Sequence, residues 1–244
     1  MMHAKPILFS GSMVRANIRE VHQPGTGKTQ TRRVLKPQPF LDRMGNFCVP
    51  DRKGKTWNWG QNIDGSPCVH NFIAEHVRYA PGDVLWVRET WMVCGEGVWT
   101  IADARMRMAP RQRTIYAADA TGADANGPWW PSIHMPREFS RLTLGVTDVR
   151  VERLQDISEA DALAEGVCQF CEDSDRTGSW EGLSSEDRAM VVCAMYGSAV
   201  RAYSHLWDTI NGAGAWDANP WVVAVTYRPH LLNVDAFLAQ QVAA

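Results

Sequence analysis

No stretch of the sequence is apolar over a length sufficient to cross a membrane. A membrane-spanning helix needs about 18 or more consecutive apolar residues, and the 244-residue chain contains no such run. Its first residues, Met1–Pro6, also lack the apolar segment of a secretory signal. We therefore expect a cytoplasmic protein without a membrane partner.

The sequence has almost no excess of one charge. Its 25 lysines and arginines nearly balance 27 aspartates and glutamates, which gives a formal net charge of −2. Proteins that bind long nucleic acids over a broad surface are usually strongly basic, so a site for an anion must be local here. The basic residues include two clusters, one made of Lys28, Arg32, Arg33 and Lys36 and the other of Arg105, Arg107, Arg111 and Arg113. This distribution favours a small anionic ligand over a long duplex.

A complete set of metal ligands is also missing. Of the six cysteines, Cys168 and Cys171 form a Cys-x-x-Cys pair, but neither a second close cysteine pair nor a His-x-x-x-His motif accompanies it. We expect a reduced protein whose cysteines serve mainly as small apolar side chains, with no bound metal and no cofactor.

The segment richest in polar chemistry is Gly25–Arg33, which reads Gly-Thr-Gly-Lys-Thr-Gln-Thr-Arg-Arg. Its first half resembles the end of a phosphate-binding P-loop, but His22 stands where that motif requires its first glycine. Downstream, Pro37 and Pro39 arrive before a full helix can form. We therefore do not interpret the segment as a nucleoside triphosphatase loop.

The second half of this segment fits a strand beside a small pocket. The residues Thr29, Thr31 and Arg33 alternate and share one face of such a strand, and the other face takes Gln30, Arg32 and Val34. Simple alternation does not put Lys28 on the threonine face. The preceding glycines allow the loop to turn Lys28 toward the threonine face. A desolvated lysine beside a threonine hydroxyl loses its proton readily and can act as a base. The alternative is an ordinary exposed strand.

The clearest strand in the sequence is Pro81–Trp91, which begins with a Pro-Gly-Asp turn. Within it, Glu89 falls on a face otherwise formed by Leu85, Val87 and Trp91. A carboxylate on an apolar face is costly unless it is paired. Glu89 is therefore expected either to meet an arginine or to point into a polar site.

A compact helix is expected over 157–167. Ser158 has the character of its N-cap and Gly166 that of its end. Glu165 lies in the last turn, where a carboxylate faces the negative end of the helix dipole. This unfavourable placement is a weak indication of a role beyond solubility.

The remaining patterns indicate one mixed α+β domain with insertions. Strands are expected over 6–10, 113–118, 141–153 and 221–227, and helices over 13–21 and 185–210. We predict a single domain over 1–232, with loop-rich insertions at 40–80 and 99–135, an insertion with a long helix at 168–212, and a C-terminal tail at 233–244.

Several short motifs together resemble the ASCH superfamily, and more narrowly its larger members often found in phages and prophages. They are Ile7-Leu-Phe-Ser10, Lys28-Thr-Gln-Thr-Arg-Arg33, Pro81-Gly-Asp83, Leu154-Gln-Asp-Ile-Ser158, Ala164-Glu-Gly166 and Trp221-Val-Val-Ala-Val225. The most specific are the Lys-Thr-x-Thr-x-Arg strand and the Glu-Gly pair. The resemblance implies an α+β fold with a PUA-like mixed β-barrel of about five to seven short strands, flanked by helices and interrupted by long loops. It also implies a cleft for nucleotides or RNA.

The resemblance further implies a catalytic site. Some ASCH proteins are small amidohydrolases that deacylate N4-acetylcytidine and are proposed to use a lysine, a threonine and a glutamate. By motif these residues fall on Lys28, Thr31 and Glu165. We expect an amidohydrolase acting on N4-acylated cytosine nucleosides, in which Lys28 takes the Thr31 proton and Thr31 attacks the acyl carbonyl, or in which Lys28 activates a water. Gly27 departs from the family, where a long side chain commonly precedes the lysine.

Three residues are candidates for holding the base: Arg33 and Glu89 by hydrogen bonds, and Trp91 by stacking. The expected partner is a small nucleoside, with RNA as the alternative, and the expected state is a monomer or weak dimer. Two other functions fit the same cleft. One is a non-catalytic module that binds RNA or a modified nucleotide, and the other is an ASCH-type ribonuclease that uses Lys28 and the arginines.

Overall fold

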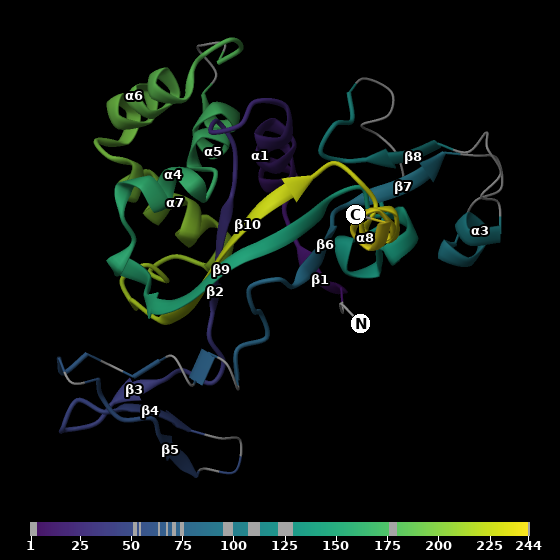
Figure 1. Ribbon diagram of the computed structural model, residues 1–244. Coiled ribbons are helices and arrows are strands. Elements are labelled where there is room, and N and C mark those ends of the chain that lie inside the picture. The colour runs from purple at the N-terminus through teal and green to yellow at the C-terminus, as the bar shows by residue number, and fades with distance from the viewer. Residues whose placement is uncertain are drawn as a thin grey trace.

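The computed structural model describes residues 4–243 except 51–52, 54, 63, 67, 70–71, 74–75, 95–99, 107–112, 122–128 and 176–179. Arg107 and Arg111, and parts of the insertions predicted at 40–80, 99–135 and 168–212, lie outside the described residues. The chain is mixed α+β, as predicted (Figure 1).

The elements carry the labels of Figure 1. The strands are β1 (Ala4–Leu8), β2 (Gln30–Val34), β3 (Phe40–Leu41), β4 (Phe47–Pro50), β5 (Thr56–Asn58), β6 (Val84–Arg88), β7 (Trp91–Cys94), β8 (Arg113–Tyr116), β9 (Thr143–Arg153) and β10 (Trp221–His230). The helices are α1 (Gly11–His22), α3 (Ile101–Met106), α4 (Glu159–Ala164), α5 (Val167–Ser174), α6 (Ser185–Tyr196), α7 (Ala199–Asn211) and α8 (Val234–Ala243).

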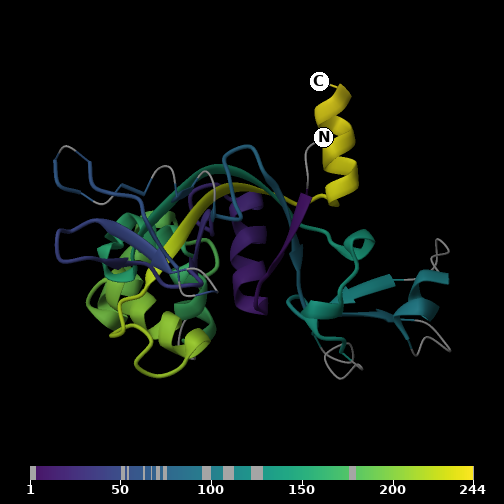
Figure 2. The ribbon, with the colours of Figure 1, turned by 90° about the horizontal axis from the view of Figure 1, so that it is seen from below.

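A five-stranded sheet in the order β1-β6-β9-β10-β2 forms the centre of the molecule. β1 runs parallel to β6, and every other neighbouring pair in this sheet is antiparallel. The alternating valines of β9 and β10, Val149, Val151, Val223 and Val225, enter a buried core that also receives side chains from α1, α5 and α7. Figure 2 shows β9 and β10 arching over α1 and the group α4–α7.

The central sheet is curled but open, and in the described residues no sheet closes into the barrel that the sequence analysis predicted. Strands β7–β8 and β3–β5 form separate sheets instead of joining the central one. The edge strands β1 and β2 are connected through α1. They approach each other at one end, where Arg33 on β2 donates a hydrogen bond to the carbonyl oxygen of Leu8 on β1 over 2.6 Å.

The single long helix predicted over 185–210 is two helices, α6 and α7. Gly197 ends α6 with φ of 86°, a left-handed conformation that glycine adopts without a Cβ penalty. Ser198 then begins α7, and its hydroxyl accepts a hydrogen bond from the backbone N–H of Arg201. A cap signal of this kind inside one apolar stripe was not recognised from the sequence.

The Cys-x-x-Cys pair lies on α5, a helix that the sequence analysis did not predict. Cys168 and Cys171 are both buried free thiols. Burial raises the pKa of both, that of Cys171 to about 12, so neither is a ready thiolate at neutral pH. This placement agrees with their expected use as small apolar side chains.

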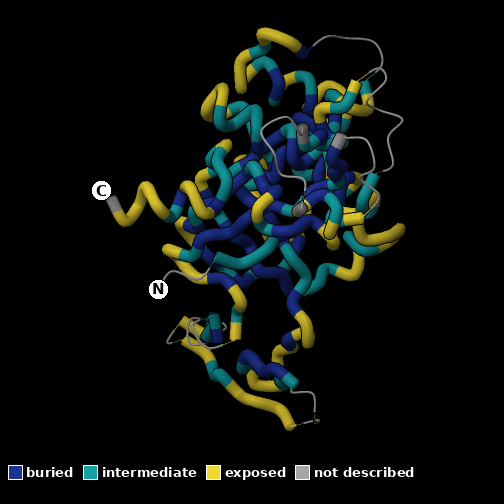
Figure 3. The backbone as a smooth tube through the Cα atoms, turned by 90° about the vertical axis from the view of Figure 1, so that its right-hand side faces the viewer, coloured by how far each residue is buried: buried dark blue, intermediate teal, exposed yellow. Residues whose placement is uncertain are grey.

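Two peripheral parts extend from this body. The sheet β3–β5 projects away from it (Figure 3), and Phe47 anchors the sheet by edge-on contacts with Phe72 and Trp221 at ring-centre distances of 5.4 and 5.1 Å. The tail forms α8, whose Val234 and Phe237 pack on the β6 residues Val84 and Trp86. In the part of the chain that the structure describes, no helix combines the length and the apolar character needed to cross a membrane.

Candidate functional site

The glycine loop before β2 is occupied by a carboxylate of the same chain. The backbone N–H of Gly25 donates to both carboxylate oxygens of Glu20 at 3.0 Å, and that of Gly27 donates to one of them at 2.9 Å. A P-loop would offer these N–H groups to a phosphate. The loop instead caps the end of α1, in agreement with our interpretation that it is no triphosphatase loop.

Gly27 is fixed by its contact with α1. A Cβ at this position would lie 2.3 Å from the carbonyl oxygen of Ala16 and 2.4 Å from the backbone nitrogen of Glu20. No side chain fits there unless the backbone of α1 moves, so the close approach of the loop to α1 requires glycine at this position. The tight approach also brings the Lys28 backbone N–H to Ala16, to which it donates over 3.0 Å.

Lys28 is buried against Glu165. The residue is only 2% exposed, and its Nζ donates to the backbone carbonyl oxygen of Glu165 at 2.6 Å and to Oε2 of the same residue at 2.9 Å. Glu165 ends α4, and Gly166 follows it with φ of 83° and packs against the Lys28 side chain. The predicted Ser158 cap is confirmed, since its side chain accepts a hydrogen bond from the Asp161 N–H.

Arg32 completes this buried ion cluster. Simple alternation puts Lys28 and Arg32 on one face, although the glycine loop was expected to turn Lys28 toward the face of Thr31. The Nη1 of Arg32 donates to Oε1 of Glu165 at 3.0 Å, and its Nη2 donates to Glu152 at 2.6 Å. Lys28 and Arg32 thus contact the same carboxylate, as simple alternation would place them. Glu165 therefore lies between a lysine and an arginine, an arrangement for which the sequence contains no local signal.

Burial shifts the acid–base behaviour of the lysine. Desolvation lowers the pKa of Lys28 below the ordinary lysine value, and the opposing attraction of Glu165 only partly restores it. The positive charges of Arg33 and Arg32 lower this pKa further. Lys28 is thus easier to deprotonate than a surface lysine.

Thr31 lies in the same cavity and has an unused hydroxyl. The residue is 3% exposed, and within the described residues its side-chain oxygen takes part in no hydrogen bond, including none with Lys28. Lys28, Thr31 and Glu165 all line one cavity of about 800 Å³, which we call the main cavity. Pockets of roughly 300–1,000 Å³ are typical of small-molecule sites.

Of the three residues predicted to hold the base, the structure brings only Arg33 to the main cavity. Glu89 instead forms a two-pronged ion pair with Arg141, with both N···O distances at 2.9 Å. Trp91 is fully buried and stacks on Phe139 at a ring-centre distance of 4.6 Å. Thr90, which lies between Glu89 and Trp91, lines the cavity, so the sequence analysis chose the wrong alternate positions of this segment.

The aromatic lining of the main cavity comes from Phe9, which follows β1, and from α7. Tyr203 and Trp207 line it, and the Trp207 indole N–H is buried without a hydrogen-bond partner in the described part of the chain. Both residues lie within the helix expected over 185–210, at the helical spacing that is typical of core residues. Periodicity alone cannot separate a side chain that packs in a core from one that also faces a cavity at its edge.

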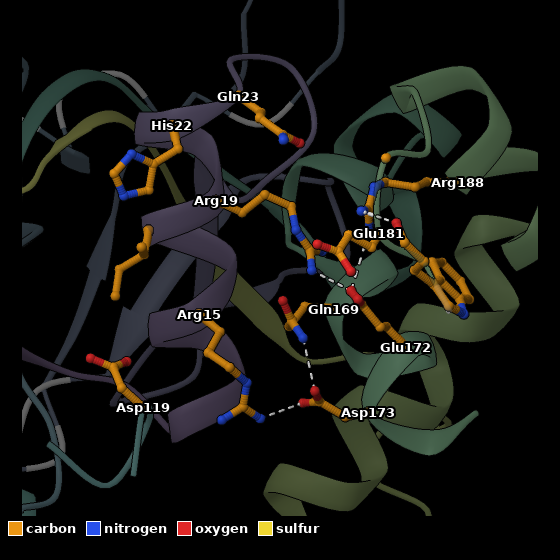
Figure 4. Close-up of a pocket in the computed structure, with 13 residues that line it drawn as sticks. Arg15, Arg19, His22, Gln23, Asp119, Gln169, Glu172, Asp173, Glu181 and Arg188 are labelled. Atoms are coloured by element: carbon orange, nitrogen blue, oxygen red, sulfur yellow. Dashed lines mark hydrogen bonds and ion pairs between the residues drawn. The ribbon is translucent and has the colours of Figure 1, made fainter. Parts of the chain in front are cut away.

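A second cavity, of about 780 Å³, lies between α1 and the α5–α6 region (Figure 4). Its arginines are paired with acids of the same cavity. Arg15 bonds Asp173 at 2.9 Å, while Arg19 and Arg188 both bond Glu172, the latter at 3.2 Å. This network fastens α1 to its neighbours and leaves no evident excess charge for a ligand, so we place the candidate site in the main cavity.

No three His, Cys, Asp or Glu side chains of the described residues gather closely enough to hold a metal ion. No protein-family model, curated protein or solved structure matches the chain. The case for a function therefore depends on the resemblance of short motifs and on the geometry of the main cavity.

Proposed function

We propose that this protein is an amidohydrolase that removes the acyl group from N4-acylated cytosine nucleosides, within a PUA-like ASCH fold. One observation carries the proposal. The lysine, threonine and glutamate identified by motif at positions 28, 31 and 165 line a single cavity of about 800 Å³, and the threonine hydroxyl there has no partner among the described residues.

The geometry around Lys28 suits a base. A neutral lysine amine has two N–H groups and one lone pair, and its two donors have acceptors in the backbone and carboxylate oxygens of Glu165. The lone pair is then the part of the amine left for a proton from the cavity. Arg32 holds the other carboxylate oxygen, so Glu165 stays oriented while the charge on Lys28 changes.

In the proposed reaction, Lys28 takes the Thr31 hydroxyl proton, and the Thr31 oxygen attacks the acyl carbonyl carbon. The resulting tetrahedral intermediate collapses as the bond from the carbonyl carbon to N4 breaks, and the ammonium of Lys28 returns the proton to N4. Water then hydrolyses the acyl-threonine ester and releases the carboxylic acid. In the alternative course Lys28 activates that water directly, and Thr31 orients the amide.

The direct test is to incubate the protein with N4-acetylcytidine and, separately, with an unmodified RNA. The proposal expects cytidine and acetate from the first and no fragments from the second. Fragments of the RNA would identify the ribonuclease alternative. Binding of either compound without conversion would identify a non-catalytic module and contradict the proposed function.

The pH dependence of deacylation is a further prediction. The reactive form of Lys28 is the neutral amine, so kcat/KM should rise with pH and level off above the pKa of Lys28. Because burial lowers this pKa, the plateau should be reached below the ordinary lysine value of 10.5. A kcat/KM that is still rising with pH above 10.5, or that falls as the pH rises, measured with N4-acetylcytidine under steady-state conditions, would argue against Lys28 as the base.

A further inference from the structure

The positive charges that line the main cavity differ in how they are neutralised. Lys28 and Arg32 are buried and bonded to Glu165, the only carboxylate among the described residues that line it. Arg33 and Lys36 also line the cavity, and neither is paired with a carboxylate in the described part of the chain. Arg33 is half-buried and donates only to the Leu8 carbonyl oxygen, while Lys36 is exposed.

The first turn of α1 lies beside these two cations. Ser10 and Met13 line the same cavity. The first N–H groups of an α-helix have no partner within the helix, and here the Ser10 side chain makes no capping hydrogen bond and the first turn contains no acidic residue. These N–H groups and the positive end of the helix dipole therefore add to the charges of Arg33 and Lys36.

One side chain in the cavity independently indicates a polar ligand. Thr31 is only 3% exposed and lines the cavity, and its hydroxyl has no hydrogen-bond partner among the described residues. Buried polar groups normally have partners. Its presence in the cavity that holds the unpaired cations distinguishes this cavity from the second one, where arginines meet acids of the same chain.

We propose that Arg33, Lys36 and the first turn of α1 bind a phosphate group, so that the substrate is a 5′-mononucleotide of an N4-acylated cytosine. The acylated base in this inference rests on the proposed amidohydrolase function, whereas the phosphate site does not depend on that function. Arg33 lies two residues beyond Thr31 on the same face of β2, about 7 Å along the strand. The base then lies near Lys28 and Thr31, and the phosphate lies at the mouth of the cavity.

Binding of the unacylated product tests the phosphate site without any catalysis. By calorimetry, cytidine 5′-monophosphate should bind about 10- to 100-fold more tightly than cytidine, as expected for one or two charge-assisted hydrogen bonds. The variant Lys36→Gln, an exposed position, and the variant Arg33→Gln should each remove much of this preference, whereas Arg33→Lys should retain part of it. Arg228→Gln is the matched control, because Arg228 is exposed on β10 and does not line the cavity.

Equal binding of the nucleoside and its monophosphate, or no detectable binding of the monophosphate, would overturn the proposed phosphate site. So would a preference that survives both glutamine substitutions. Turnover provides the second comparison, among N4-acetylcytidine, its 5′-monophosphate and a trinucleotide with the acetylated base in the middle. The monophosphate should have the lowest KM, and a lower KM for the trinucleotide would contradict a mononucleotide substrate. If none of the three is deacylated while the monophosphate preference in binding holds, the amidohydrolase proposal fails and the phosphate site stands.

Discussion

Replacing Lys28 by methionine is expected to lower the rate of deacylation by about 100- to 10,000-fold, the range that general acid–base catalysis supplies. It is also expected to reduce the free energy of unfolding by about 3 kcal/mol, because it leaves the buried carboxylate of Glu165 without one of its two cationic partners. This loss of stability is at the lower end of the range for breaking a buried ion pair, because Arg32 stays bonded to Glu165. Steady-state kinetics and denaturant unfolding measure the two effects separately.

The double variant Lys28→Met with Glu165→Gln separates chemistry from folding. Without a charge at position 165, most of the lost stability should return, while the rate should remain as low as in the single variant. Lys5→Met is the matched control: Lys5 pairs with Asp83 at 2.6 Å, but both side chains are partly exposed, and such a pair contributes only about 0–1 kcal/mol. A folded Lys28→Met protein that deacylates as fast as the parent would refute the role of this amine.

The local features of the site were accessible from the sequence because they depend on neighbouring residues. The Ser158 cap and the glycine at 166 are short-range signals, and the structure contains both. The grouping of Lys28 with Glu165 came from a resemblance of motifs, since 137 residues separate the two in the chain. No periodicity carries information over that distance.

The role of Arg32 shows what the sequence could not supply. Its carboxylate partners Glu152 and Glu165 lie 120 and 133 residues away, on elements whose approach depends on the whole fold. Strand alternation places Arg32 on the same face as Lys28, but it gives no information about which carboxylate meets them, because Glu165 ends a helix far away in the chain. The only indication of these contacts in the sequence was an arginine within a predicted strand, since an arginine that is buried is usually paired with a carboxylate.

Whether the sheet closes into a barrel likewise cannot be predicted from a local sequence pattern. Each predicted strand of the proposed barrel has a counterpart in the structure, but whether β7 continues the central sheet or pairs with β8 depends on how the chain turns after Arg88. That turn also decides which of Glu89, Thr90 and Trp91 faces the main cavity. A shift by one residue exchanges the two faces of a strand. The prediction of a closed barrel and the choice of Glu89 and Trp91 as site residues were therefore both wrong at this point.

Replacing Thr31 by valine is expected to reduce deacylation by about 1,000-fold or more, the scale on which loss of a nucleophile acts, while leaving the protein stably folded. Thr31 is buried, yet its hydroxyl has no partner within the described residues, so valine of nearly the same shape breaks no hydrogen bond. The free energy of unfolding should therefore change by less than about 1 kcal/mol. This substitution should therefore lower the rate of deacylation with little change in the free energy of unfolding.

Thr29→Val is the matched control, since Thr29 immediately precedes β2 but does not line the main cavity. It should leave the rate unchanged. Thr31→Ser keeps a hydroxyl that could either form a covalent ester or orient the amide, so only detection of that ester distinguishes the two courses of the reaction. Mass spectrometry of quenched reactions should detect an added acyl group at position 31 in the threonine and serine proteins. If Thr31→Val retains a rate within about tenfold of the parent, a difference of about 1.4 kcal/mol in activation free energy, Thr31 only orients the substrate and the attacking group is a water activated by Lys28.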